Sequence, residues 1–201
     1  LFIADEVITG FGRTGAWFAS QTMGLRPDMM TLAKGLTSGY VPMSAVMVGD
    51  RVANRLIADG GEFYHGFTYS GHPVAAAVAL ANLDLIEGEG LIERVRTDTG
   101  PYLADALAPL ASHRIVGEVR SFGMLAAIEL VKSKDGPEMF EDTGAVGVIC
   151  RDHAIANGLM MRAVRDAMIL SPPLTFGRAD IDATVRMATA ALDATADQLG
   201  L

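Results

Sequence analysis

Short apolar runs alternate with turn residues through the first half of the chain. They predict strands at residues 1–7, 29–33 and 43–48, because each run is bounded by glycine, proline or charged side chains. The runs show no regular polar alternation, which is typical of a sheet covered by helices. Pro73 suits the first turn of a helix that runs to about Ile86, since proline lacks the amide that would be unpaired there.

The second half carries a different order of patterns. A helical pattern at residues 91–110 is interrupted by Gly100 and Pro101, where we expect a kink or a break. Beyond it the patterns predict, in order, strands at 115–120 and 124–131, a helix at 143–157, strands at 159–164 and 168–170, and an amphipathic helix with Ile181, Val185, Ala188, Leu192 and Leu199 on one face. This ββαββα order predicts a small α/β unit of its own. We therefore place a domain boundary between residues 98 and 99.

Composition and charge narrow the classes of partner. Half of the 201 residues are hydrophobic (50%), which is enough for a substantial core. The formal charge is -8, from 24 acidic and 16 basic residues, and no cluster of Lys and Arg appears. This balance argues against nucleic acid or an anionic membrane surface and favours a small molecule. No apolar run approaches the roughly 20 residues that cross a bilayer, so we expect a soluble protein.

Cysteine and histidine usage points to the compartment. The single cysteine, Cys150, excludes an intrachain disulfide, and four scattered histidines show no metal-ligand spacing. A reducing cytoplasm and no metal site are the expectations. Leu1 already lies within a strand pattern, without an initiator Met or a leading turn, so we also expect a piece of a longer polypeptide.

Asp5 and Lys34 are the most informative residues of the chain. Each is a charged residue at the end of an apolar strand pattern, where an unpaired buried charge would cost several kcal/mol, roughly. A lysine amine that can form a Schiff base, near a carboxylate that can hold a pyridinium nitrogen, is the minimum equipment for pyridoxal phosphate chemistry. The alternatives are a surface lysine at a strand end and a structural carboxylate that caps a loop.

A glycine-rich segment from Gly10 to Gly15 matches the dinucleotide fingerprint G-x-G-x-x-G and follows a strand pattern. Its spacing is unfavourable, because Asp5, Glu6 and Val7 lie between the apolar run and the first glycine. The segment after Gly15 then reaches Gly24 and Pro27 before any long helix. A plain turn is the favoured interpretation, with nucleotide binding as the alternative.

A polar loop at residues 65–73 combines two glycines, three hydroxyl side chains and the start of a helix. Amides and hydroxyls of this kind can bind phosphate. A polar loop followed by an N-capped helix is an equally good interpretation of the segment alone.

Arg162 is a cation within the apolar strand pattern at 159–164. Its guanidinium could bind a carboxylate with two parallel hydrogen bonds. The alternative is an arginine whose stem packs while its head reaches water, and Arg165 is a competing candidate for the same role.

Taken together, these segments resemble the class III, or omega, aminotransferases of pyridoxal phosphate fold type I. The resemblance rests on motifs in order and spacing: Asp5-Glu6-Val7, Gly10 to Gly15, Pro27-Asp28, Leu32-Ala33-Lys34-Gly35, the loop at 65–73, and Met161-Arg162-Ala163 followed by Ser171-Pro172-Pro173-Leu174. The last block is similar to the branch that takes omega-amino acids or amines as donors and pyruvate as acceptor.

The resemblance implies a site. Lys34 would form the internal aldimine with pyridoxal 5'-phosphate, Asp5 would hold the pyridinium nitrogen, and Val7 would pack against the ring. Phe67 and Thr68 would also bind the cofactor, with Thr68 reaching the phosphate in a partner subunit. The protein would then be a homodimer with its site at the subunit interface.

The resemblance also implies a fold and a reaction. Residues 1–98 would be the C-terminal part of the large domain, a mixed sheet with helices on both faces, and residues 99–201 a small C-terminal α/β domain. The enzyme would transfer an amino group from a primary amine or omega-amino acid to a keto acid, with pyruvate favoured and Arg162 binding its carboxylate.

Two other functions stay open at this point. One is an NAD-binding oxidoreductase that uses Gly10 to Gly15, and the other is a non-catalytic fragment for dimerisation or interaction. The amine donor is also open, because a diamine such as putrescine, beta-alanine or an aryl amine would each fit. Since the chain corresponds to the C-terminal half of the family, we expect it to be inactive without the other half.

Overall fold

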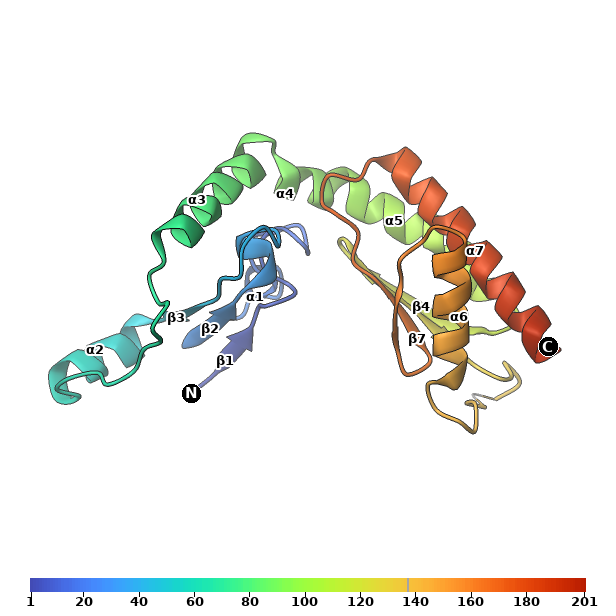
Figure 1. Ribbon diagram of the computed structural model, residues 1–201, viewed down its shortest axis with the longest axis horizontal. Coiled ribbons are helices and arrows are strands. Elements are labelled where there is room, and N and C mark those ends of the chain that lie inside the picture. Colours follow the sequence, from blue (N-terminus) through green and yellow to red (C-terminus); the bar gives the residue numbers. More distant parts are fainter. Residues whose placement is uncertain (137) are drawn as a thin grey trace. The chain divides into compact units, whose positions relative to one another are not determined.

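The computed structural model describes residues 1–136 and 138–201, and the chain forms two compact units, Leu1–Arg94 and Val95–Leu201 (Figure 1). Each unit is described by itself. The identification of these units with the large and small domains stays a prediction.

The first unit contains a mixed sheet of three strands. They are β1 (Ile3–Asp5), β2 (Met29–Leu32) and β3 (Ala45–Val48), in the order β1-β2-β3. β1 and β2 are parallel, with Asp5 opposite Thr31, whereas β2 and β3 are antiparallel. The carboxyl ends of β1 and β2 therefore meet at one edge of the sheet.

Helices of the first unit follow the glycine and proline signals. They are α1 (Ala19–Thr22), the 3₁₀ turn η1 (Lys34–Leu36), α2 (Asp50–Asp59), α3 (Pro73–Gly88) and α4 (Leu91–Arg94). The helix predicted at Pro73 is confirmed. Its N-cap residue His72 accepts a hydrogen bond from the Ala75 amide at 3.4 Å. The apolar pattern did not predict α2, because none of its residues is buried.

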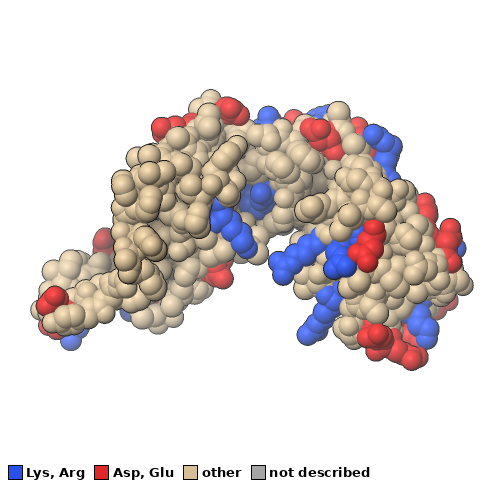
Figure 2. Space-filling model, viewed as in Figure 1, with Lys and Arg blue, Asp and Glu red and all other residues tan. Residues whose placement is uncertain are grey.

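The strand faces of this unit are open among the described residues. Ile3 is 53% exposed, and Val46 and Met47 are 56% and 52% exposed, so no helix within residues 1–136 and 138–201 covers these positions. The surface over α3 that faces the viewer in Figure 2 also carries few charged side chains. Apolar runs that the sequence marks as strand cores thus remain at the surface of this chain.

The second unit is an α/β layer pair. A four-stranded antiparallel sheet in the order β4-β5-β7-β6 is formed by β4 (Val116–Phe122), β5 (Leu125–Leu130), β6 (Arg162–Val164) and β7 (Ala167–Leu170). The helices are α5 (Gly100–Leu107), α6 (Ala145–Ala156) and α7 (Arg178–Leu199), and the short helical turns η2 (Val95–Thr99) and η3 (Ala108–Ser112) directly precede and follow α5. The predicted ββαββα order is confirmed.

A single hydrophobic core joins this sheet to its helices. Ile128, Leu130 and Met168 from the strands meet Cys150 of α6 and Leu192 of α7, all without exposed surface. The apolar face predicted for the last helix lies in or against this core.

The interruption at Gly100 and Pro101 has a local form. The helix continues through a π-helical turn, η2, placed directly before Pro101, whose ring lacks the amide that a regular α-helix would use. A Cβ on Gly100 would lie 2.4 Å from the Val95 carbonyl oxygen, so only glycine fits there. The expected break is thus a change of helical pitch.

Candidate active site

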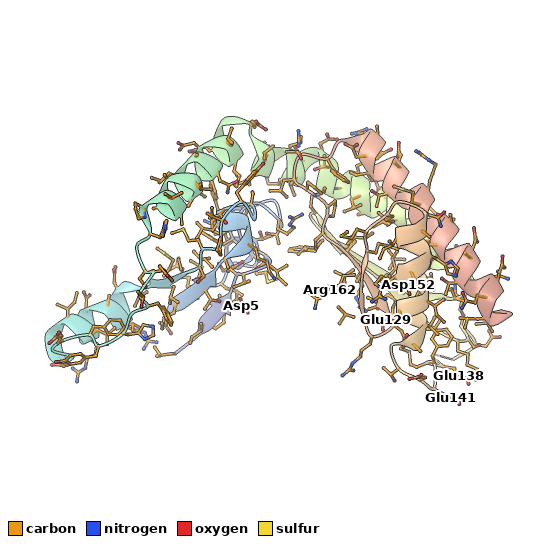
Figure 3. The ribbon with its side chains drawn as sticks, in the orientation of Figure 1. Asp5, Glu129, Glu138, Glu141, Asp152 and Arg162 are labelled. Atoms are coloured by element: carbon orange, nitrogen blue, oxygen red, sulfur yellow. The ribbon has the colours of Figure 1, made fainter. Side chains whose placement is uncertain are left out.

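Asp5 lies at the carboxyl end of β1, beside the end of β2 (Figure 3). Its Oδ1 accepts hydrogen bonds from the Val7 amide at 3.1 Å and from the Thr31 hydroxyl at 2.9 Å. Among the residues that the structure describes, its Oδ2 accepts none and is free for a further donor.

The environment of Asp5 favours its charged form. The hydrogen bond from the Val7 amide, the one from the Thr31 hydroxyl and, more weakly, the positive charge of Lys34 lower the pKa of Asp5 below its ordinary value. Asp5 is therefore a carboxylate at neutral pH, with one oxygen held and one free.

Lys34 begins η1 directly after β2, and its positive charge acts on Asp5. Its backbone φ is 44°, in the left-handed region that a side chain rarely adopts, which costs of order 1–3 kcal/mol. Behind it, a Cβ on Gly35 would lie 3.0 Å from Cβ of Phe11, so the turn is packed closely against the glycine-rich segment. Lys34 thus sits in a strained, tightly packed turn, a feature that clusters at functional sites.

The burial that the sequence pattern suggested for these two charges is not found in the chain. Asp5 and Lys34 are both exposed. What singles them out is their common edge of the sheet, where ligands of open α/β sheets bind.

Glu6 organises the segment that follows β1. The residue is 2% exposed, and its carboxylate accepts hydrogen bonds from the Thr9 hydroxyl and from the Ala19 and Ser20 amides at 2.9 and 2.7 Å. Burial raises the pKa of Glu6, but these hydrogen bonds outweigh it and leave the pKa lowered. Sequence reasoning assigned Glu6 no role, although a second acid beside Asp5 in an apolar run was the available signal.

The glycine-rich segment forms a compact turn. Gly12 and Gly15 have φ of 96° and 83°, and Phe11 packs edge-on against Phe18 with ring centroids 5.7 Å apart. The following helix, α1, has 4 residues and begins at Ala19, so the motif does not lead directly into a long helix as in a dinucleotide site. The geometry favours the plain turn that the spacing indicated.

The other residues predicted to bind the cofactor, Val7, Phe67 and Thr68, also belong to the first unit. Val7 is half-buried beside Asp5, to which its amide donates. Phe67 and Thr68 lie in an exposed turn, where the Phe67 amide donates to the Ser70 hydroxyl at 3.1 Å. Among the described residues, no hydrogen bond joins that turn to Asp5 or Lys34.

Arg162 belongs to the second unit and lies on the face of the sheet opposite α6 and α7 (Figure 3). It opposes Ile169 of β7, is exposed, and forms no ion pair within the described part of the chain. Arg120, in the same row of the sheet, is instead held by Glu118 at 2.6 Å and Glu129 at 2.9 Å. Arg162 is thus a cation with its hydrogen-bonding groups available.

The hairpin that carries Arg162 is fixed by Asp166. This residue is 2% exposed, and its carboxylate accepts hydrogen bonds from the Gly144 amide at 2.8 Å and the Gly147 amide at 2.9 Å, at the start of α6. A Cβ on Gly147 would lie 2.0 Å from the Arg165 carbonyl oxygen. The competing candidate Arg165 has φ 54° and serves as the turn residue of this hairpin.

Metal binding and membrane insertion find no support in the structure described. Within residues 1–136 and 138–201, no group of three or more His, Cys, Asp or Glu side chains is placed to hold a metal ion. No helix in that part of the chain is both long and apolar enough to cross a membrane.

The fold and the site agree with one family. The chain belongs to the class-III aminotransferases, whose family pattern matches residues 1–192. It is 57% identical over 196 residues to the putrescine–pyruvate aminotransferase of Pseudomonas aeruginosa, and the match covers 98% of this chain and 42% of that protein. It is also 43% identical over 205 residues to the diaminobutyrate–2-oxoglutarate transaminase of Halomonas elongata, covering 99% of this chain and 44% of that protein.

Solved structures give the same result. The omega transaminase of Pseudomonas jessenii in complex with PMP matches with a TM-score of 0.91 at 41% identity, over 98% of this chain and 44% of that one. A thermostable fourfold mutant of an omega transaminase from the same organism matches with a TM-score of 0.92, over 99% of this chain and 45% of that one. The predicted family and the mixed α/β fold are confirmed, and the chain spans less than half the length of these relatives.

Proposed function

We propose that this chain supplies the catalytic lysine, Lys34, and the ring-binding carboxylate, Asp5, of a pyridoxal-phosphate-dependent aminotransferase. The observation that carries the proposal is the pair itself. A charged carboxylate with one free oxygen and a lysine in a strained turn lie at the same edge of a sheet, at the carboxyl ends of neighbouring parallel strands.

The residues fit that cofactor. A pyridinium N–H needs a charged acceptor, and Asp5 has a lowered pKa and a free Oδ2. An aldehyde needs an amine free of competing partners, and the side-chain amine of Lys34 makes no hydrogen bond among the described residues. When bound, pyridoxal phosphate supplies an electron sink for the bond broken at the amine-bearing carbon. The half-buried Val7 beside Asp5 would contact the ring.

Each residue then has a stated task. Asp5 would keep a proton on the ring nitrogen of the cofactor through its negative charge. The Lys34 amine would hold the cofactor before the substrate binds and, once free, would accept the proton that leaves the substrate carbon and return it later in the reaction. Thr31 and the Val7 amide hold the Asp5 carboxylate in one orientation.

The proposed donor is a primary amine or an omega-amino acid, and the proposed acceptor is pyruvate. Support comes from Arg162, an exposed and unpaired guanidinium that suits a keto-acid carboxylate. It also comes from the relatives, because the pyruvate-named relative is 57% identical and the 2-oxoglutarate-named one 43%. Arg162 would bind the carboxylate of the keto acid. A donor without a carboxylate would not make this contact.

We further propose a homodimer in the cytoplasm. The turn around Thr68 is flanked by Phe67 and Tyr69, which are 75% and 82% exposed, and aromatic side chains at that exposure suit a subunit contact. Thr68 would reach the cofactor phosphate of the partner subunit from this turn. The single buried thiol, Cys150, is compatible with a reducing compartment.

The test uses a chimaera that supplies the length the chain does not span. In it, this chain replaces the matching 196 residues of the Pseudomonas aeruginosa relative. Purified with pyridoxal phosphate, the chimaera should show the visible absorbance of a lysine-bound cofactor and aminate pyruvate from a panel of diamines, omega-amino acids and aryl amines. Faster turnover with 2-oxoglutarate than with pyruvate would refute the proposed acceptor, and a colourless chimaera would refute the proposed cofactor.

A further inference from the structure

One side chain of α3 reaches the turn that follows Lys34. The Nδ2 of Asn82 donates hydrogen bonds to the Gly35 carbonyl at 2.8 Å and to the Leu36 carbonyl at 3.1 Å. Its Oδ1 accepts a hydrogen bond from the Ser38 hydroxyl at 2.7 Å. Because carbonyl oxygens only accept, the two contacts also settle which end of the amide faces the turn.

The turn needs such a partner. η1 has 3 residues, so its last carbonyls find no amide of the same helix to accept from. The backbone conformations at its two ends are also unfavourable, since Lys34 has φ 44° and Ser38 has φ 49°, both in the left-handed region. Asn82 supplies donors to the two carbonyls between these strained residues, from a position 47 residues away in sequence.

The other contacts of the turn are apolar or local. Leu36 and Thr37 are buried, and the Thr37 hydroxyl donates to the Val41 carbonyl at 2.7 Å. These contacts hold the far side of the turn but leave the carbonyl of Gly35, directly after Lys34, without another hydrogen bond in the described chain. The Lys34 carbonyl accepts from the Thr37 amide at 3.2 Å, and Asn82 supplies the side-chain hydrogen bond to the carbonyl that directly follows it.

We infer that Asn82 is a positioning residue for the Lys34 amine. It touches none of the reacting groups, and it acts by holding the strained turn in the conformation that keeps Lys34 beside Asp5. The inference rests on the proposed role of Lys34. A displacement of a reacting group by about 1 Å can lower a rate by up to about 100-fold, so release of this turn should be visible in catalysis.

The stability of α3 has other sources, which makes the two roles separable. Ala75, Ala79 and Ile86 of the same helix are buried and stay in place when Asn82 is changed. A purely structural Asn82 would change the melting temperature and the folded fraction alone. A positioning Asn82 changes the chemistry of Lys34 in the folded molecule.

The experiment compares variants of the chimaera loaded with pyridoxal phosphate. Asn82→Leu removes the whole amide at similar volume, and Asn82→Asp keeps an acceptor for Ser38 but turns an oxygen towards the two carbonyls. Ser38→Ala removes only the third hydrogen bond. Asn157→Leu is the matched control, because its amide also donates to one backbone carbonyl, that of His153 at 3.0 Å, in the second unit.

Four readouts decide the outcome: the pH midpoint of the bound-cofactor absorbance, the rate of borohydride trapping on Lys34, hydrogen exchange at the Leu36 and Thr37 amides, and kcat against KM. For both Asn82 variants we expect a shifted midpoint, slower trapping, faster exchange, and a kcat lowered by about 10- to 100-fold with little change in the KM for pyruvate. Ser38→Ala and Asn157→Leu should stay near the parent.

Unchanged midpoint and trapping in the folded Asn82 variants would overturn the inference, even if their melting temperatures fell. If Asn82→Leu does not fold, the same criteria apply to Asn82→Asp. Failure of the proposed function has a different result: Lys34→Ala would still bind the cofactor covalently. Loss of covalent binding in Lys34→Ala together with normal Asn82 variants refutes only the role of Asn82.

Discussion

Replacement of Asp166 by alanine should destabilise the second unit strongly. The carboxylate is buried and accepts two amide hydrogen bonds, from Gly144 and Gly147 at the start of α6. A hydrogen bond to a charged group contributes about 1.5–3 kcal/mol, so the loss of two gives a decrease of about 3 kcal/mol or more in the free energy of unfolding. The Leu130 amide, which donates to the Asp166 backbone carbonyl, keeps its bond in the variant.

The assay is equilibrium urea unfolding of residues 95–201, which carry their own core, followed by circular dichroism and linear extrapolation. Asp152→Ala is the matched control, because this acid lies on α6, the helix whose start bonds to Asp166, with its side chain 61% exposed. It should change the free energy of unfolding by less than about 0.5 kcal/mol. A loss below about 1 kcal/mol for Asp166→Ala, with the Gly144 and Gly147 amides still protected from exchange, would refute the reasoning.

Three other expectations concern the chimaera. Arg162→Ala should raise the KM for pyruvate at least about tenfold while amine binding and the absorbance of the loaded enzyme stay unchanged, and equal losses for both substrates would make Arg162 structural. Asp5→Asn should keep the cofactor but lose most of its turnover, measured as kcat, whereas loss of the cofactor with normal specific activity would contradict the proposed role. Arg51 and the Phe2 amide lower the pKa of Asp28 from 3.8 to about 2, so this stabilisation is present above pH 3.8 and is lost as the pH falls through about 2. Acid titration of Arg51→Ala should therefore show a smaller loss of stability over that range, and an unchanged profile would contradict the assignment.

The sequence predicts most of the secondary structure because apolar periodicity reports burial directly. The ββαββα order and the buried face of the last helix follow from it, as does the helix at Pro73. Apolar periodicity does not predict helix α2, since none of its residues is buried. The apolar runs of the first unit predict buried strands, yet these strands have exposed faces in this chain.

The site is predicted less completely, for a different physical reason. Asp5 and Lys34 stand out in sequence as charges after apolar runs, and the parallel pairing of β1 and β2 brings their ends together. Asn82 and Asp166 give no such signal, because each acts through hydrogen bonds to backbone groups that lie 19 to 47 residues away. The partners of a polar side chain depend on the tertiary fold, which periodicity does not describe.

The central claim is that Lys34 is the amine that binds the cofactor. The most direct test is to load the chimaera with pyridoxal phosphate, reduce it with borohydride, digest it and locate the added mass by mass spectrometry. We expect the label on the peptide that contains Lys34, and its absence from Lys34→Ala, while Lys134→Ala, which changes an exposed lysine of the second unit, keeps it. A label on another lysine, or turnover without any covalent label, would contradict the account.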